Sequence, residues 1–315
     1  MNALTTQHAV PIDFPATLQG RVLLNEPLAK HTSWRVGGPA DILFKPHSKQ
    51  DLALFLRTLP AELPVFWLGL GSNILVRDGG LRAAVVETHG ALNDLQRLSE
   101  TEVWCDAGVP CAKLAKQCAK WNLGPAEFFA GIPGTVGGAL AMNAGAFGGE
   151  TWRHVVEVET INRRGDIQRR LVSDYQVAYR HVRPINHAQE EWFLGAQLSF
   201  AESNADGEAE IRALLARRKE AQPIGEYSCG SVFTNPPGHH AARLIESAGL
   251  KGFHIGAARV STKHANFIIN EGAASAVELE QLINHVKATV QRQFGVELIP
   301  EVRIVGEALS SQETE

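Results

Sequence analysis

The sequence predicts an α+β protein built from three consecutive units. Some segments repeat apolar residues at intervals of three and four, as amphipathic helices do, and others alternate apolar and polar residues, as half-buried strands do. The length of 315 residues suits two or three domains. Apolar residues make up 44% and charged residues 20% of the chain, which is an ordinary globular balance.

The unit boundaries follow changes in these patterns. Residues 1–20 read as a loosely ordered lead-in, residues 21–90 as the first unit, residues 91–201 as the second and residues 202–315 as the third. A polar link from Glu202 to Gly207 separates the second unit from the third.

The first unit should contain one helix and two buried strands. Ser48 opens a capping box that ends at Asp51, and helically spaced apolar residues follow it. The short apolar runs Val65–Leu68 and Ala83–Val86 are typical of buried strands. The first of these runs leads directly into a glycine-rich turn, residues 69–73.

The second and third units are predicted from the same two periodicities. In the second unit we expect a strand at Val103–Cys105, a helix beginning at Pro110, a hairpin of Val156–Thr160 with Ile167–Leu171 around the turn Asn162–Asp166, and a strand at Trp192–Phe200. In the third unit we expect a helix through Ile211 and Leu215 that ends by Pro223, a helix at Ala241–Ala248 with Gly249 after it, strands at Phe253–Arg259 and Asn266–Asn270, a helix that begins with the capping box Ser275–Glu278, and a last strand at Val296–Val305.

Charge and cysteine usage narrow the function classes. The net charge is −4 and no basic block occurs, which argues against a nucleic-acid-binding protein. The four cysteines form no Cys-x-x-Cys pair, and Cys111 and Cys118 lie seven apart in a helical pattern, so both should face the core. Buried free thiols indicate a reducing compartment, the cytoplasm, and the first twenty residues do not resemble a signal peptide.

The uncharged segment Phe128–Gly149 is long enough to cross a bilayer. Its seven glycines and Pro133 favour a loop and a short helix instead. The twelve histidines form no His-Glu-x-x-His spacing and no cluster with cysteines, so we expect no metal.

Two glycine-rich turns could bring backbone amides close to phosphate groups. In the first, Gly69, Gly71, Ser72 and Asn73 follow a strand, although a plain structural turn explains them equally well. The second contains Gly131, Thr135, Gly137, Gly138, Asn143 and Gly145, for which close helix–sheet packing is the alternative. Two such turns in adjacent units suit a long dinucleotide such as FAD better than a mononucleotide.

Four later groups of residues carry weaker signals. Tyr179 and Arg180 read by themselves as a solvated pair, and Ser231 after Gly230 as a turn serine. Lys263, His264 and Asn266 offer charge and donors between two strands. Glu301 lies in the predicted last strand, on the same face as Arg303, where an edge carboxylate is the usual interpretation.

The order of these signals resembles the UDP-N-acetylenolpyruvoylglucosamine reductase (UDP-N-acetylmuramate dehydrogenase) family. The resemblance spans residues 21–307 and is carried by TSWRVGGPAD (32–41), GLGSNILVRDGG (69–80), PAEFFAGIPGTVGGALAMNAGAFGGE (125–150), YR (179–180), CGSVFTNP (229–236), AARLIESAGLKG (241–252), VSTKHANFIIN (260–270) and EVRIVGE (301–307).

The resemblance implies a fold and a reaction. The fold would be an FAD-binding portion of two subdomains, residues 21–90 and 91–201, of the vanillyl-alcohol-oxidase type, followed by a substrate-binding domain, residues 202–315. The reaction would be the reduction of the enolpyruvyl ether of UDP-N-acetylglucosamine to UDP-N-acetylmuramate in the synthesis of peptidoglycan precursors. NADPH would reduce the flavin, and the flavin would deliver hydride to the enol methylene carbon.

The resemblance also implies roles for individual residues. Ser231 would donate the proton, and Arg180 and Glu301 would stabilise the enol-like intermediate. Arg35 would bind FAD together with the residues of the two glycine-rich turns, and Tyr179, Arg180, Lys263, His264 and Asn266 would bind the substrate. Thr234 stands where many relatives carry lysine, which leaves the diphosphate contacts open.

The short stretch from Tyr179 to Phe200 lacks the insert of the longer subclass, so the chain resembles the shorter (type II) subclass. We expect a monomer, although the sequence does not fix the oligomeric state. Two other functions would explain the glycine-rich turns. A flavin oxidase that uses oxygen is one, and a nucleotide-sugar binding module without activity is the other.

Overall fold

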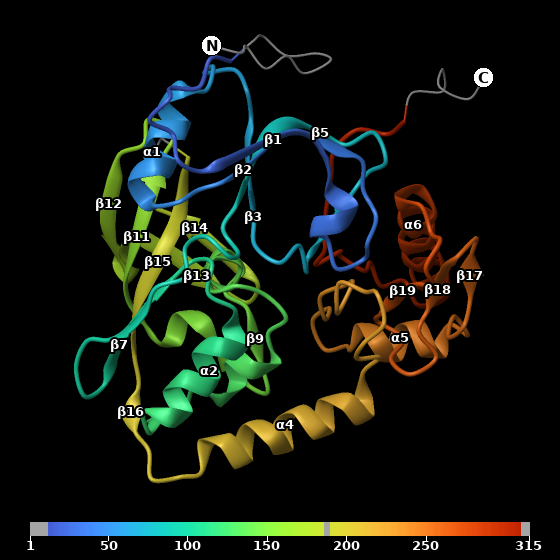
Figure 1. The fold of residues 1–315 in the computed structure, drawn as a ribbon. Helices are drawn as coiled ribbons and strands as arrows, with labels where there is room; N and C mark the ends of the chain where they lie inside the picture. The colour runs from blue at the N-terminus through green and yellow to red at the C-terminus, as the bar shows by residue number, and fades with distance from the viewer. Residues whose placement is uncertain (1–11, 186–189, 310–315) are drawn as a thin grey trace. The chain divides into compact units, whose positions relative to one another are not determined.

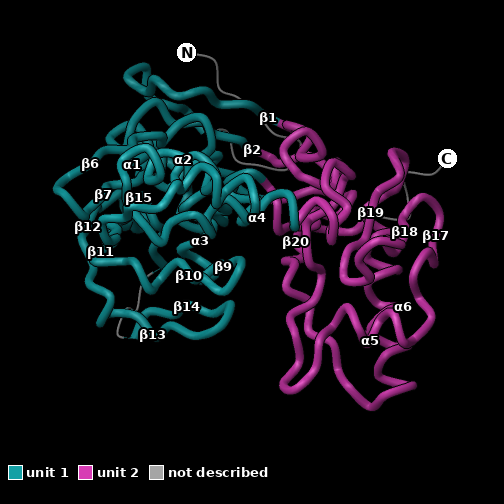
Figure 2. The backbone as a smooth tube through the Cα atoms, turned by 90° about the horizontal axis from the view of Figure 1, so that it is seen from below, with its two compact units in different colours: residues 1–24, 42–70, 83–217 teal, residues 25–41, 71–82, 218–315 magenta. Residues whose placement is uncertain are grey.

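The computed structural model describes residues 12–185 and 190–309 (Figure 1). The chain divides into two compact units, and each unit is made of three segments that are separate in the sequence (Figure 2). Unit 1 contains Met1–Leu24, Ile42–Leu70 and Ala83–Arg217, and unit 2 contains Asn25–Asp41, Gly71–Arg82 and Arg218–Glu315. The expected boundaries at residues 20, 90 and 201 stay a prediction, and most of the lead-in lies outside the described residues.

The helices and strands of the described chain fall into three consecutive stretches of the sequence, residues 21–87, 95–199 and 201–305. The first stretch forms β1 (Arg21–Pro27), η1 (Leu28–His31), β2 (Pro39–Lys45), α1 (Lys49–Thr58), β3 (Val65–Leu68), β4 (Ile74–Val76) and β5 (Leu81–Glu87). The second forms β6 (Leu95–Arg97), β7 (Glu102–Asp106), α2 (Cys111–Lys120), β8 (Leu123–Gly124), η2 (Glu127–Gly131), α3 (Val136–Met142), β9 (Gly145–Ala146), β10 (Gly149–Glu150), η3 (Thr151–Arg153), β11 (Val155–Asn162), β12 (Ile167–Leu171), η4 (Val172–Asp174), β13 (Tyr175–Ala178), β14 (His181–Pro184) and β15 (Glu191–Ser199). The third forms β16 (Ala201–Glu202), α4 (Gly207–Ala221), α5 (Ala241–Ser247), β17 (His254–Ile255), β18 (Ala258–Val260), β19 (Ile268–Asn270), α6 (Ala276–Phe294) and β20 (Arg303–Val305).

A four-stranded sheet has the strand order β1-β2-β5-β3, and β3 runs parallel to β5. Both strands were predicted from their continuous apolar runs, which suit parallel strands. β5 is almost entirely buried, whereas three of the four residues of β3 are half-buried. Helix α1 begins where expected, because the Ser48 hydroxyl accepts a hydrogen bond from the amide of Asp51 at 3.1 Å. Its apolar face is buried, and the rings of Phe44 and Phe55 stack with their centroids 3.9 Å apart.

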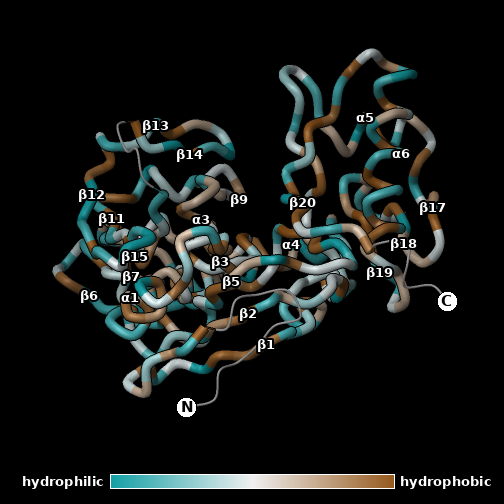
Figure 3. Tube along the Cα trace, turned by 90° about the horizontal axis from the view of Figure 1, so that it is seen from above, coloured by the Kyte–Doolittle hydropathy of each residue, from teal (hydrophilic) through white to brown (hydrophobic). Residues whose placement is uncertain are grey.

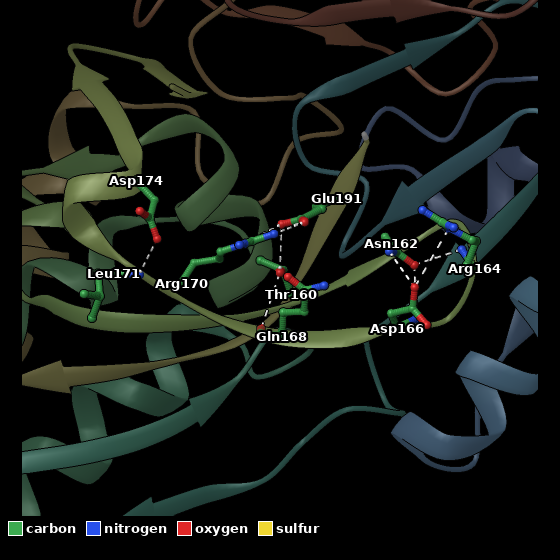
Figure 4. A network of polar contacts seen from close by, with 9 residues as sticks. All are labelled: Thr160, Asn162, Arg164, Asp166, Gln168, Arg170, Leu171, Asp174 and Glu191. Carbon is green, nitrogen blue, oxygen red and sulfur yellow. Dashed lines mark hydrogen bonds and ion pairs between the residues drawn. The ribbon is translucent and has the colours of Figure 1, made fainter. Parts of the chain in front are cut away.

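An antiparallel sheet with the order β12-β11-β15-β7-β6 forms the second layer of unit 1. The predicted hairpin is confirmed as β11 and β12. Its turn is closed by Asn162, whose Oδ1 accepts hydrogen bonds from the amides of Arg164 and Asp166 at 2.9 and 3.0 Å (Figure 4). The same figure shows Arg170 and Glu191 joined across the sheet, with Arg170 Nε donating at 3.1 Å.

Helices α2 and α3 cover a core that they share with this sheet. Helix α2 follows Pro110, as predicted, and buries Cys111, Leu114 and Cys118 completely. All four cysteines are free and buried. Burial raises the pKa of Cys118 to about 12, so this thiol stays protonated and packs as an apolar side chain.

Unit 2 combines the sheet β17-β18-β19, helices α5 and α6, and the parallel pair β4 and β20 around a separate core. The capping box of α6 is confirmed, because the hydroxyl of Ser275 accepts from the amide of Glu278 and the Glu278 carboxylate accepts from the amide of Ser275. Gly249 follows α5 with φ +75°, as expected for a residue after a helix end. Hydrophobic segments, brown in Figure 3, run through both units.

Two predicted strands are wrong in extent. The run Phe253–Arg259 folds into two short strands, β17 and β18, because Gly256 turns the chain with φ +55°. The last strand covers only Arg303–Val305 of the predicted Val296–Val305. Pro300 has no amide hydrogen to donate to a ladder, and the amides of Glu301 and Val302 both donate to Val232 instead.

The uncharged segment 128–149 folds into η2, α3, β9 and β10, as a loop and short helix rather than a membrane span. None of the helices in the described part of the chain is both long and apolar enough to cross a membrane.

Candidate active site

The first glycine-rich turn and the loop before α3 approach each other very closely. A Cβ atom added at Gly69 would lie 2.5 Å from the hydroxyl oxygen of Thr135. Thr135 is the residue before α3, but its side chain does not cap the helix. Its hydroxyl is buried and has no hydrogen-bond partner among the described residues. A side chain at position 69 would therefore collide with Thr135, and glycine permits the approach.

Backbone contacts join the ends of three strands to the same place. Strand β3 ends beside β5, because the amide and the hydroxyl of Thr88 both donate to the carbonyl of Leu68, at 2.9 and 3.2 Å. After β7, the carbonyl of Ala107 accepts from the amide of Gly137 at 2.8 Å. The loop that carries Thr135 is thus bonded to the residue that follows β7 and lies against Gly69, the residue that follows β3.

The glycines of the second glycine-rich turn and of the segment 125–150 around it have different roles. Cβ atoms at Gly131, Gly137 and Gly145 would meet Phe147, Ala107 and Gly149 at 2.4, 2.8 and 2.2 Å, so these three glycines serve close packing. Gly138 is exposed, and a Cβ atom there would find only the Thr135 hydroxyl, 3.9 Å away. Gly138 thus has open space beside it, and it lies next to the hydroxyl of Thr135, for which the described residues offer no partner.

Asn143 and Arg180 form one cluster at the end of α3. Asn143 ends the helix in the left-handed conformation, with φ 45°, and its side chain is bonded to the main chain of Ala178 and Trp152. Arg180, in the turn between β13 and β14, donates to the carbonyls of Asn143 and Gly145 at 3.3 and 3.1 Å. The guanidinium lies 4.8 Å from the ring centre of the exposed Tyr179.

The rest of the first glycine-rich turn belongs to unit 2. Gly71 has φ +59°, and a Cβ atom there would lie 2.0 Å from the carbonyl oxygen of His31, so no side chain fits. Ser72 and Asn73 follow in the same turn. Arg35 also has positive φ, +59°, and its exposed guanidinium donates to the carbonyl of Lys30 at 3.0 Å.

Ser231 and Glu301 lie on two segments of unit 2 that are joined by backbone hydrogen bonds. The amides of Glu301 and Val302 donate to the carbonyl of Val232, at 2.8 and 3.4 Å. Gly230 precedes Ser231 with φ +80°, and Val232 and Phe233 are buried behind it. The structure therefore brings Glu301 beside the residue that follows Ser231.

The expectation that Glu301 and Arg303 share a strand face is wrong. Glu301 precedes β20, in a bend of the chain, and only Arg303 belongs to that strand. The alternation of side chains that a strand imposes does not reach Glu301.

The three residues between β18 and β19 differ in their surroundings. Lys263 is exposed and its ammonium donates to the carbonyl of Lys219. Burial, together with the positive charge of Lys251, lowers the pKa of His264, so its imidazole is neutral near pH 7. Asn266 is buried and bonded through both polar atoms to the main chain of Phe233, at 3.0 and 2.8 Å. Asn266 therefore holds the main chain of the segment that contains Ser231 in place.

Sequence reasoning missed the residues that hold these loops in place. The indole of Trp34 donates to the carbonyl of Ile268, and the amide group of Asn270 donates to the carbonyl of Trp34, each at 2.8 Å. Both side chains are buried, and their partners are more than 230 positions away. The signal available in the sequence was their place inside the motifs TSWRVGGPAD and VSTKHANFIIN.

A flavin dinucleotide fits what unit 1 offers. The buried hydroxyl of Thr135, which has no hydrogen-bond partner among the described residues, can donate to a phosphate oxygen, and Gly138 beside it leaves open space. In the described ranges, no three His, Cys, Asp or Glu side chains gather as a metal site would require.

Comparison with known proteins gives matches in both halves of the chain. Residues 40–170 match the family described as FAD binding domain, and residues 222–305 match the UDP-N-acetylenolpyruvoylglucosamine reductase C-terminal domain. The UDP-N-acetylenolpyruvoylglucosamine reductase of Alkalilimnicola ehrlichii is 56% identical over 90% of this chain and 95% of its own length. The Legionella pneumophila (strain Paris) reductase is 54% identical over 92% and 95%, respectively.

Solved structures agree with these matches. The UDP-N-acetylenolpyruvylglucosamine reductase of Thermus caldophilus superposes with a TM-score of 0.75 at 30% identity, over 91% of this chain and 98% of that one. The 6-hydroxy-D-nicotine oxidase of Arthrobacter nicotinovorans, at 13% identity and a TM-score of 0.53, covers 92% of this chain and 90% of its own and shares the fold alone. The predicted α+β fold with an FAD-binding portion is confirmed. The chain therefore belongs to the UDP-N-acetylenolpyruvoylglucosamine reductase family.

Proposed function

We propose that Ser231, Arg180 and Glu301 are the catalytic residues of this chain. As a member of its family, the chain reduces UDP-N-acetyl-3-O-(1-carboxyvinyl)-glucosamine to UDP-N-acetylmuramate in an FAD-dependent reaction with NADPH. The observation that carries our assignment is the pair of hydrogen bonds from Glu301 and Val302 to the carbonyl of Val232. They hold a carboxylate-bearing residue beside the segment of Ser231.

The reaction replaces the π bond of the enolpyruvyl group by two C–H bonds. FAD, when bound, carries the hydride that reaches the methylene carbon. The neighbouring carbon, which bears the carboxylate, must then take up a proton. We assign this proton to the hydroxyl of Ser231. A serine hydroxyl is a weak acid, so it can act only when it is aligned with a strongly basic carbon. The carbanion-like intermediate left by hydride addition is such an acceptor.

Arg180 and Glu301 complete the proposed set. A guanidinium offers donors in a fixed planar fork, which suits the oxygens of a carboxylate as negative charge develops on them. The bonds from Arg180 to the carbonyls of Asn143 and Gly145 restrict its orientation before substrate arrives. Glu301 would stabilise the protonated, enol-like form of the same carboxyl group. Arg180 belongs to unit 1, and Ser231 and Glu301 belong to unit 2.

We assign the remaining predicted residues by their surroundings. Gly69, Thr135 and Gly138 would contact FAD directly, with Gly71, Ser72, Asn73 and Arg35 as further contacts, whereas Gly131, Gly137, Asn143 and Gly145 would act by shaping the loops. Tyr179, Lys263 and His264 would contact the nucleotide-sugar substrate, and Asn266 would position the Ser231 segment. Burial of the His264 imidazole in its neutral form suits a hydrogen bond to an uncharged group of the substrate.

We further infer a monomer in the cytoplasm, of the shorter subclass. Four buried cysteines, all of them free, are compatible with a reducing compartment. Light scattering of the purified protein checks the monomer, since a mass of twice 34.2 kDa would contradict it.

An absorbance experiment tests the proposed function. The purified protein should carry the visible absorbance band of oxidised flavin. Under nitrogen, NADPH should bleach this band, and the enolpyruvyl sugar should then restore it with formation of UDP-N-acetylmuramate. Recovery of the band with oxygen but not with the sugar would overturn the proposal in favour of an oxidase. A colourless protein that binds the sugar but takes up no FAD would favour a binding module.

A further inference from the structure

The main chain of Glu301 is fixed on both sides. Its amide donates to the carbonyl of Val232, next to Ser231, at 2.8 Å. Its carbonyl accepts a hydrogen bond from the side-chain amide of Asn73 at 3.1 Å. All three segments belong to unit 2. Glu301 thus connects the Ser231 segment with the first glycine-rich turn.

Asn73 is well placed to hold this residue. Its own carbonyl accepts a hydrogen bond from the amide of Arg303 at 3.1 Å. Directly after Asn73, β4 pairs with β20 in parallel register, with Ile74 opposite Arg303. Asn73 therefore contacts the chain on each side of Val302, through a side-chain donor and a main-chain acceptor. Glu301 and Val302 form a bend directly before β20, so Glu301 is outside the regular strand.

Regular strand pairing does not account for this side-chain bond. In a parallel ladder, main-chain amides supply the donors, and side chains stand away from the ladder. The ladder of β4 and β20 runs from Arg303 opposite Ile74 to Val305 opposite Val76 and does not include Glu301. The bond from the Asn73 side chain extends the contact between the two segments to Glu301.

We infer that Asn73 is a positioning residue for Glu301, in addition to lying in the turn proposed to contact FAD. This inference rests on the proposed role of Glu301. The hydrogen bond fixes the main chain from which the Glu301 carboxylate projects. A misplacement of about 1 Å in a catalytic group can cost about a hundredfold in rate. The turn at residues 69–73 therefore sets the position of a group that acts on the substrate.

The test separates the two half-reactions in the complete protein loaded with FAD. Asn73→Ala removes the donor, and Asn73→Asp replaces it by an acceptor of the same size. Reduction of the flavin by NADPH, measured at equal flavin content, should slow much less than reoxidation, because Glu301 has no role in that step, whereas loss of an Asn73 contact to FAD would affect both steps. Reoxidation by the enolpyruvyl sugar should slow by about 10- to 100-fold in both variants. Stopped-flow absorbance at saturating FAD measures both rates.

A double-mutant cycle distinguishes positioning from a general effect. In a Glu301→Gln background, Asn73→Ala should slow reoxidation by less than about threefold further, because the group that it positions has already been altered. The loss in Asn73→Ala should appear in the limiting rate of reoxidation at saturating sugar and not in the sugar concentration that gives half of this rate, because the positioned group acts in the chemical step. A merely structural defect that leaves part of the protein unfolded would lower the amplitude of the reaction and leave its rate constant unchanged.

Two control variants bracket the result. Glu280→Gln weakens the neighbouring bond from Arg77, at 2.8 Å, and should lower the melting temperature without slowing reoxidation selectively. Ser72→Ala lies in the same turn but has no bond to Glu301, so excess FAD should restore most of any loss. The Asn73 variants are compared at equal flavin content, and Asn73→Asp serves if Asn73→Ala does not fold.

The outcomes have distinct meanings. Selective loss of reoxidation that is not additive with Glu301→Gln supports the inference. Equal slowing of both half-reactions, or full additivity with Glu301→Gln, overturns it while leaving the proposed function intact. If Glu301→Gln itself leaves reoxidation unchanged, the proposed role of Glu301 fails, and the inference fails with it.

Discussion

Thr135 places its hydroxyl oxygen 2.5 Å from where a Cβ atom on Gly69 would lie, and this hydroxyl is buried without a partner in the described part of the chain. An unpaired buried hydroxyl destabilises a protein by about 1–3 kcal/mol relative to a bonded one. The arrangement is understandable if a bound group supplies the missing partner. Stability without ligand and affinity for ligand should then depend on Thr135 in opposite directions.

Thr135→Val tests this expectation, because valine has the same shape without the hydroxyl. The protein stripped of FAD should unfold at the same or a higher urea concentration, since no hydrogen bond is lost. Affinity for FAD should fall by about tenfold, the loss of roughly one hydrogen bond to a charged group. Flavin fluorescence titration measures the affinity. Unchanged affinity would show that the hydroxyl faces something other than the cofactor.

The pair Gly137 and Gly138 separates packing from ligand contact. Gly138→Ala should leave the FAD-free protein as stable or up to about 1 kcal/mol more stable, because alanine favours a helix and the new methyl group has space. It should nevertheless weaken FAD binding. Gly137→Ala should destabilise the FAD-free protein, because its methyl group would lie 2.8 Å from Ala107. Thermal melting with and without FAD checks both variants, and identical behaviour would contradict the distinction.

Asn266 should contribute to the free energy of unfolding of the protein through its two bonds to Phe233. Asn266→Ala leaves both the amide and the carbonyl of Phe233 without their partners, which should cost about 2–4 kcal/mol in the free energy of unfolding. Asn266→Asp keeps the acceptor for the Phe233 amide but places a buried carboxylate oxygen against the Phe233 carbonyl, so it too should lower the free energy of unfolding in urea denaturation. A loss below about 0.5 kcal/mol for Asn266→Ala would show that Phe233 finds other partners.

His154 predicts a loss of stability toward acid. Burial lowers its pKa, although a bond between Nδ1 and the carbonyl of Ser199 opposes the shift in part. The unfolded chain therefore binds a proton at about pH 6.5, where the folded protein does not, so unfolding becomes easier as pH falls below that value. His154→Asn, which cannot titrate, should lose less stability than the unchanged protein between about pH 7.5 and pH 5.5. Equal losses in urea denaturation would remove His154 as a source.

Local patterns predicted much of the fold. The capping boxes at Ser48 and Ser275, the hairpin turn at Asn162 and the glycine after α5 each depend on residues a few positions apart, so the sequence reveals them. The strand at residues 296–305 was overpredicted, because the amides of Glu301 and Val302 bond to Val232, about seventy positions away. Pattern alone cannot show such a partner.

The candidate site could be predicted only in part, because several of its contacts join residues that are far apart in the sequence. Glycine clustering indicated close approach, and the structure shows it at Gly69, but the sequence could not separate packing glycines such as Gly137 from the open Gly138. Asn266 was predicted to contact the substrate. Its side chain bonds to the main chain of Phe233, a contact that the sequence does not reveal. The roles of Ser231, Arg180 and Glu301 came from the family resemblance, and they stay predictions.

The half-reactions of Ser231→Ala test the central claim most directly. Reduction of the flavin by NADPH should remain nearly unchanged, because no proton from Ser231 enters that step. Reoxidation by the enolpyruvyl sugar should slow by about 10²–10⁴-fold, the usual contribution of a general acid. Ser228→Ala, in the same loop, is the matched control and should leave both rates close to normal. Equal slowing of both half-reactions in Ser231→Ala, or no slowing of reoxidation, would contradict the account.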